Sequence, residues 1–149
     1  MKLYFPEISF SAAHYIPGHK KCGGIHGHTY YIRDLTIDLG EPKLDQSGMS
    51  IDFGIIKGYF KDHWDHKFIV PTNHYMFLQK ALIDCEFPEE LNPPMISNMV
   101  PLEFTTCEGM AEVIREQLVI LLRQSYGDWI NPSCISFKLF EGPNQAVEV

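Results

Sequence analysis

Three histidines and one cysteine near the amino terminus have the residue types and the spacing of a metal centre. His26 and His28 flank Gly27, and alternate side chains of a strand point to the same face, so the two imidazoles lie together. His14, on a preceding strand, could supply a third nitrogen. Three neutral imidazoles with an open fourth position suit a catalytic zinc ion, whereas structural zinc is usually enclosed by four protein ligands. The pattern therefore predicts a metal-dependent enzyme.

Cys22 lies four residues before this histidine pair and is the predicted reactive thiol. A glycine-rich loop, the neighbouring Lys20 and Lys21, and a nearby dication all favour the thiolate, which can act as a general base. The same features also fit a solvated loop with an inert cysteine. Cys107 is the rival, because it is expected at a helix N-terminus, which also lowers the pKa of a thiol. The sequence favours Cys22.

Two further sets of side chains could take part in the chemistry. Asp65 and His66 are adjacent, and a carboxylate bonded to an imidazole fixes its tautomer for proton transfer. A surface Asp–His pair explains the same residues equally well. Glu141 precedes a sharp turn and is either a site carboxylate or a charge on an edge strand. The other histidines are expected to be ordinary surface or core residues: His19, His63 and His74.

Composition limits the class of protein. The 149 residues, 45% hydrophobic and 21% charged, predict a single globular domain over residues 1–149. A net charge of −7 argues against nucleic-acid binding but leaves room for an anionic small substrate. Neither a signal peptide nor a membrane span is recognisable. The four cysteines form no paired motif, so free thiols in a reducing, cytoplasmic compartment are expected.

Hydrophobic patterning predicts an α+β chain. Strands are expected over residues 2–14, 26–39, 134–140 and 146–149, and helices over 52–63 and 105–126. Asp52 and Thr105 are the expected N-caps, with Glu108 completing a capping box, and Gly127 the C-cap. Between about 70 and 104 lies an insertion with a short helix over 73–84, followed by a proline-rich extended loop.

The order ββ-α-insertion-α-ββ predicts a four-stranded antiparallel sheet with two helices on one face. Such an open sheet leaves two edges unpaired. Pairing of edge strands between subunits would cover them, so an oligomer is expected.

These motifs together resemble the 6-pyruvoyltetrahydropterin synthase and 6-carboxytetrahydropterin synthase superfamily, which has the tunnelling fold (T-fold). The resemblance covers most of the chain. The motifs that carry it are Phe10-Ser11-Ala12-Ala13-His14, Cys22-x-x-x-His26-Gly27-His28, Ile51-Asp52-Phe53, Asp65-His66-Lys67, Thr106-x-Glu108 and Glu141.

The resemblance implies a role for each matching residue. His14, His26 and His28 match the zinc ligands, Cys22 the catalytic thiol, and Asp65 with His66 the proton relay. Glu141 matches the carboxylate that anchors the pterin, and Thr105 and Thr106 match a segment that contacts it. The family assembly is a homohexamer of two stacked trimers that form a β-barrel, with sites at subunit interfaces.

The implied substrate is 7,8-dihydroneopterin triphosphate. In the carboxy branch acetaldehyde leaves and 6-carboxy-5,6,7,8-tetrahydropterin enters queuosine biosynthesis, whereas the pyruvoyl branch eliminates triphosphate and isomerises the side chain. The short spacing from Cys22 to His26 favours the carboxy branch. A related pterin side-chain lyase, or a pterin binder without catalysis, are the other interpretations. The insertion, and Phe104-Thr105 in place of the common Asn-Pro, depart from the family pattern.

Overall fold

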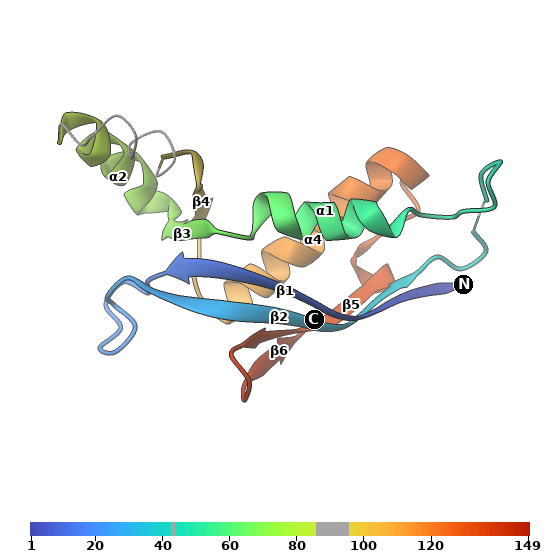
Figure 1. Ribbon diagram of the computed structural model, residues 1–149, viewed down its shortest axis with the longest axis horizontal. Helices are drawn as coiled ribbons and strands as arrows, with labels where there is room; N and C mark the ends of the chain where they lie inside the picture. Colours follow the sequence, from blue (N-terminus) through green and yellow to red (C-terminus); the bar gives the residue numbers. More distant parts are fainter. Residues whose placement is uncertain (43, 86–95) are drawn as a thin grey trace.

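A long hairpin forms the centre of the molecule, which is described here by a computed structural model covering residues 1–42, 44–85 and 96–149 (Figure 1). Strand β1 (Lys2–His14) pairs antiparallel with β2 (His26–Asp38), from Lys2 opposite Asp38 to His14 opposite His26. The ladder is interrupted at Pro6, opposite which Asp34 has a positive φ of 56°. Both strands were expected, including the irregularity at the proline.

The hairpin lies within a six-stranded sheet of order β4-β3-β1-β2-β5-β6. Strands β5 (Ile135–Glu141) and β6 (Ala146–Glu148) extend it antiparallel from β2, after the short 3-10 helix η1 (Pro132–Cys134). Strands β3 (Lys67–Pro71) and β4 (Met99–Leu102) extend it on the other side with parallel pairing.

The expected four-stranded antiparallel sheet is therefore wrong in strand number and in strand direction. Of the two extra strands, β4 lies within the region taken as an insertion, and β3 begins just before it, at Lys67, and runs into its start. They are four or five residues long and largely apolar, and so short an apolar run has no period that separates a strand from a loop or a buried helix segment.

Two helices cover one face of the hairpin (Figure 1). Helix α1 (Phe53–His63) begins at the N-cap Asp52, whose carboxylate accepts from the amide of Gly54, as expected. Helix α4 (Cys107–Tyr126) ends at Gly127, which has a φ of 100°. The central core lies between these helices and the sheet. Its largest fully buried side chains include Trp64, Tyr30, Phe60, Phe137 and Met110.

A third helix, α2 (Thr72–Asp84), confirms the expected short helix and projects beyond the end of the hairpin (Figure 1). It packs on β3 and β4 through a second, smaller cluster built on Val70, Leu82 and Met99. The proline-rich loop expected after it falls mainly on residues 86–95, which lie outside the described residues. In the described part of the chain, no helix has the length and apolarity needed to cross a membrane.

The N-terminus of α4 differs from the expected capping box by one residue. Thr106, not Thr105, is the N-cap, and its hydroxyl accepts from the amide of Gly109. Thr105 is instead buried, with 3% of its surface exposed, and its hydroxyl donates to the carbonyl of Tyr15 at 2.6 Å. The threonine before the helix is free for this contact because its neighbour takes the capping role.

Candidate functional site

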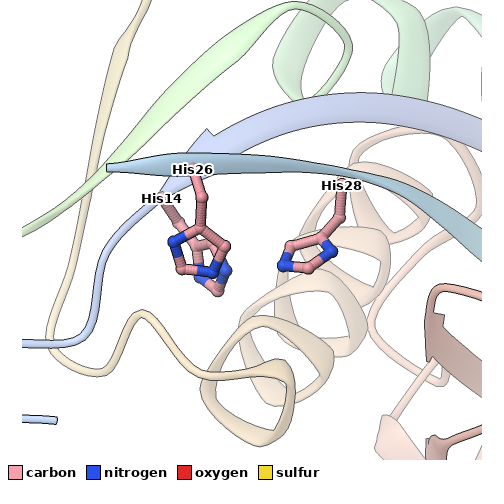
Figure 2. A group of neighbouring side chains, drawn as sticks. All are labelled: His14, His26 and His28. Atoms are coloured by element: carbon pink, nitrogen blue, oxygen red, sulfur yellow. The ribbon is translucent and has the colours of Figure 1, made fainter. Parts of the chain in front are cut away.

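The three histidines converge at the end of the hairpin, and their rings project from the same side of β1 and β2 (Figure 2). The ring centroids of His14 and His26, a directly opposed pair, are 4.5 Å apart, and that of His28 lies 5.2 and 4.9 Å from them. One nitrogen of each residue lies within 4.8 Å of the others. This group can hold a metal ion.

Backbone carbonyls orient two of the rings. His14 Nδ1 lies 2.7 Å from the carbonyl oxygen of Thr105, and His26 Nδ1 lies 2.7 Å from that of Gly24. A carbonyl can only accept, so Nδ1 carries the proton and the lone pair remains on Nε2, as in most metal-bound histidines. His14 Nε2 is buried and has no hydrogen-bond partner among the described residues. Such a nitrogen fits a metal ion.

Glu141 adds a carboxylate to the cluster. Its Oε1 lies 3.2 Å from His14 Nε2 and 3.7 Å from His28 Nε2, off the direction of a hydrogen bond. The hydroxyl of Tyr30, opposite Glu141 in the β2–β5 pairing, donates to the same oxygen at 3.2 Å. Contact with His14 holds the pKa of Glu141 below its ordinary value. Burial alone would lower the pKa of His14, but Glu141 and the Thr105 carbonyl raise it.

Cys22 is half-buried in a loop that closes on itself. Its carbonyl accepts from the amide of Ile16 at 2.8 Å, and its own amide donates to His19 Nδ1 at 2.9 Å. Gly23 is required here, because a Cβ atom would lie 2.6 Å from the carbonyl oxygen of His19. His19 was expected to be an ordinary surface or core residue, yet its ring shapes the loop that carries the thiol.

Cys107 lies in a setting that opposes a thiolate. Burial, followed by the charges of Glu141 and Glu108, raises the pKa of the thiol to about 12. Its sulfur lies 3.5 Å from the carbonyl oxygen of Leu139. Desolvation and the nearby carboxylates thus oppose the thiolate that a helix N-terminus favours, and this supports Cys22 over Cys107.

A cavity of about 390 Å³ opens beside Glu141. The first turn of α4 and strand β6 form its walls, and His19 and Ile16 face it from the Cys22 loop. Thr106 lines this cavity, whereas Thr105 is buried behind it. The volume is within the range of small-molecule sites.

Asp65 and His66 form the expected pair, with His66 Nδ1 2.9 Å from Asp65 Oδ2. The amide of Ser11 donates to the other oxygen of Asp65 and holds its pKa below the ordinary value, ahead of the contact with His66. His66 has a φ of 56°, and 83% of its side chain is exposed. Within the described residues, this pair forms no hydrogen bond or ion pair with the three histidines or with Cys22. His66 and His28 nonetheless line the same open cavity, of about 550 Å³, together with residues of β1 and β3.

Comparison with known proteins gives a consistent result. Residues 5–149 match the family model described as 6-pyruvoyl tetrahydropterin synthase. The chain is similar to proteins named 6-carboxy-5,6,7,8-tetrahydropterin synthase from Rickettsia bellii and Rickettsia felis. Each is 31% identical over 145 residues, which cover 96% of both chains.

Among solved structures, the fold resembles that of 6-pyruvoyl tetrahydropterin synthase from Plasmodium falciparum. The TM-score is 0.56 at 22% identity, and the match covers 100% of this chain and 94% of the other. At this identity the likeness concerns the fold alone.

Proposed function

Because the chain belongs to the 6-pyruvoyl tetrahydropterin synthase family, we propose that it is a zinc-dependent lyase that acts on 7,8-dihydroneopterin triphosphate. The products are 6-carboxy-5,6,7,8-tetrahydropterin, acetaldehyde and triphosphate, which places the protein in queuosine biosynthesis. The relatives of similar length named for this product support the carboxy branch. So does the short spacing between Cys22 and His26.

The observation that carries this proposal is the set of three imidazoles beside a carboxylate and a small-molecule cavity. Nε2 of His14 and His26 is left free for a metal by the carbonyl contacts of Nδ1, and His28 completes the set. Zinc bound there would act as a Lewis acid that makes the hydroxyls of the substrate side chain more acidic.

The chain's own residues then have distinct tasks. Cys22 accepts a proton from the substrate side chain as general base. His66, oriented by Asp65 at 2.9 Å, delivers or relays a proton. Glu141 accepts N–H groups of the pterin ring through its carboxylate, and Thr106, which lines the cavity at the start of α4, contacts the ring. Tyr30 fixes the Glu141 oxygen that faces the histidines.

The exposed position of the Asp65–His66 pair supports a site shared between subunits. The pair lies against Ser11 at the edge of β1, and His66 is largely free of contacts within the chain. A homohexamer of two stacked trimers would let this pair face the cavity of a neighbouring copy. The closed β-barrel of such an assembly would also cover the open edges of the sheet.

Product analysis tests the function directly. Zinc-loaded protein is incubated with 7,8-dihydroneopterin triphosphate, and the products are identified by mass spectrometry. Acetaldehyde and 6-carboxytetrahydropterin should form, and Cys22→Ala should lose them while retaining zinc. Cys85→Ala removes an exposed thiol at the end of α2 and serves as the control, with activity near that of the native protein.

Other products would indicate a different reaction. Formation of 6-pyruvoyltetrahydropterin would identify the pyruvoyl branch, and a pterin aldehyde or alcohol a related side-chain lyase. Binding of the pterin without turnover would leave a binding protein and overturn the proposal.

A further inference from the structure

Helix α2 contacts the site region at Tyr15, which packs against the cluster of Val70, Leu82 and Met99 and also contacts a histidine of the helix. The hydroxyl of Tyr15 lies 2.8 Å from Nδ1 of His74, the third residue of the helix. The two rings also stack, with centroids 5.9 Å apart and planes inclined by 20°. Phe68 of β3 also contacts the ring of Tyr15, with centroids 6.1 Å apart. Tyr15 is thus held by α2, which lies in the region that departs from the family pattern, and by β3, which leads into that region.

Tyr15 stands between the metal centre and the thiol loop. It directly follows His14, and its carbonyl accepts from the hydroxyl of Thr105, whose own carbonyl contacts His14 Nδ1. The next residue, Ile16, donates its amide to the carbonyl of Cys22. A continuous set of contacts therefore leads from α2 through Tyr15 to the backbone of Cys22.

We propose that Tyr15 and His74 are positioning residues that tie helix α2 to the loop carrying Cys22. The tie restricts the residues that follow His14, so that the backbone of Ile16 can hold the carbonyl of Cys22 in place. The insertion then serves the reaction by fixing the thiol rather than by touching the substrate. This inference rests on the proposed function for its kinetic consequence, but the tie itself is a property of the folded chain.

The test compares Tyr15→Phe, His74→Ala and the double variant in the full-length protein. The rate at which iodoacetamide modifies Cys22 is followed by peptide mass spectrometry. Loss of one hydrogen bond shifts the equilibrium between the closed and the open Cys22 loop about fivefold. Each single variant should therefore raise the modification rate up to about fivefold, because the open loop exposes the thiol. The double variant should show no further increase, because both changes remove the same bond.

Kinetics give a second readout. In zinc-loaded protein, kcat should fall by about the same factor, while KM changes little because Glu141 and Thr106 lie on other elements. His74→Asn should restore both values, since its side-chain oxygen can accept from Tyr15 near the position of Nδ1. Tyr75→Phe is the matched control: it removes a hydroxyl that bonds Gln79 within α2, and it should leave both values unchanged.

The outcomes separate the two proposals. Unchanged modification rates in Tyr15→Phe and His74→Ala, or effects that multiply in the double variant, would overturn the tie. If the native protein has no lyase activity, the proposed function fails, and the modification rates still decide whether α2 positions the thiol loop.

Discussion

At the scale of residues, the metal centre depends on how each imidazole is turned. The strand period places His26 and His28 on one face, and this could be predicted from sequence because it depends on side-chain spacing alone. The partners that fix the rings are the backbone carbonyls of Thr105 and Gly24. A carbonyl is present at every residue, so no sequence pattern could have identified these two.

The two cysteines near the cavity should differ strongly in reactivity. Both residues are half-buried, but desolvation and nearby carboxylates raise the pKa of the Cys107 thiol to about 12, whereas Cys22 lies in a loop beside two lysines. Because the thiolate is the nucleophile, iodoacetamide at neutral pH should modify Cys22 well before Cys107. Peptide mass spectrometry over time measures both rates in one sample. Equal rates, in protein shown to be folded by circular dichroism, would contradict the assignment of Cys22 as the reactive thiol.

Asp65 should make stability depend on pH. Its carboxylate accepts from the amide of Ser11 and contacts His66, so its folded-state pKa lies below the ordinary value of 3.8. Because its pKa is lower in the folded state, the Asp65 carboxylate stabilises the fold at pH values above 3.8. This stabilisation is lost as the pH falls through the folded-state pKa. Asp65→Asn keeps an acceptor for Ser11 but removes the charge.

The native protein should therefore be more stable than Asp65→Asn at neutral pH, and the difference should shrink under acid conditions. Urea unfolding midpoints across this pH range provide the measurement. A difference that stays constant down to the lowest pH would show that the charge of Asp65 contributes nothing.

At the scale of elements, the N-terminus of α4 connects packing to the site. Phe104, Thr105 and Thr106 lead into the helix, and a Cβ atom at Gly109 would lie 2.4 Å from the carbonyl oxygen of Phe104. Thr105 in turn contacts both His14 and Tyr15. The close approach at Gly109 therefore determines where a partner of the metal centre lies.

Gly109→Ala should displace this segment. Forced overpacking costs about 1–3 kcal/mol, and the shift of Thr105 should weaken zinc binding as well. Gly58→Ala is the control, because a Cβ atom at Gly58 in α1 would have no neighbour within 4 Å, so the change should stabilise the helix by about 0.5–1 kcal/mol. Urea unfolding and zinc titration measure the two effects. If the Gly109→Ala variant had the stability and the zinc affinity of the native protein, the displacement of Phe104 would have no effect on the metal centre.

The elements also show which parts of the fold a sequence can reveal. The two hairpin strands and helices α1 and α4 have long periodic patterns, and the two helices also have clear caps. All four elements were predicted close to their observed bounds. Strands β3 and β4 were missed because they are short and pair in parallel with partners distant in sequence. The N-cap of α4 was misplaced by one residue because two threonines in succession have the same capping preference.

At the scale of the whole molecule, the sheet has unpaired backbone along two edges. Strand β3 pairs with β1 only over residues 12–14, so most of the outer edge of β1 is open in the described part of the chain. The short β6 is the last strand at the other side. Pairing of β6 in one copy with β1 of the next would close three sheets into a ring and bring the Asp65–His66 pair toward a neighbouring copy.

This assembly can be broken at one backbone amide. Phe137 and Val149 exchange both backbone hydrogen bonds, so in the alternating antiparallel pattern the amide of Glu148 points outward, away from β5. Glu148→Pro removes that outward donor while keeping the inner bonds, and it should convert a hexamer into smaller species. Glu148→Ala, which retains the amide, is the control and should remain hexameric. Light scattering after size-exclusion chromatography measures the mass, and circular dichroism checks the fold.

Because the proposed site needs the Asp65–His66 pair of a neighbouring copy, lyase activity should fall with the loss of the hexamer. A Glu148→Pro variant that is monomeric and fully active would show that one chain suffices for catalysis, and a native protein that is monomeric would remove the shared site altogether.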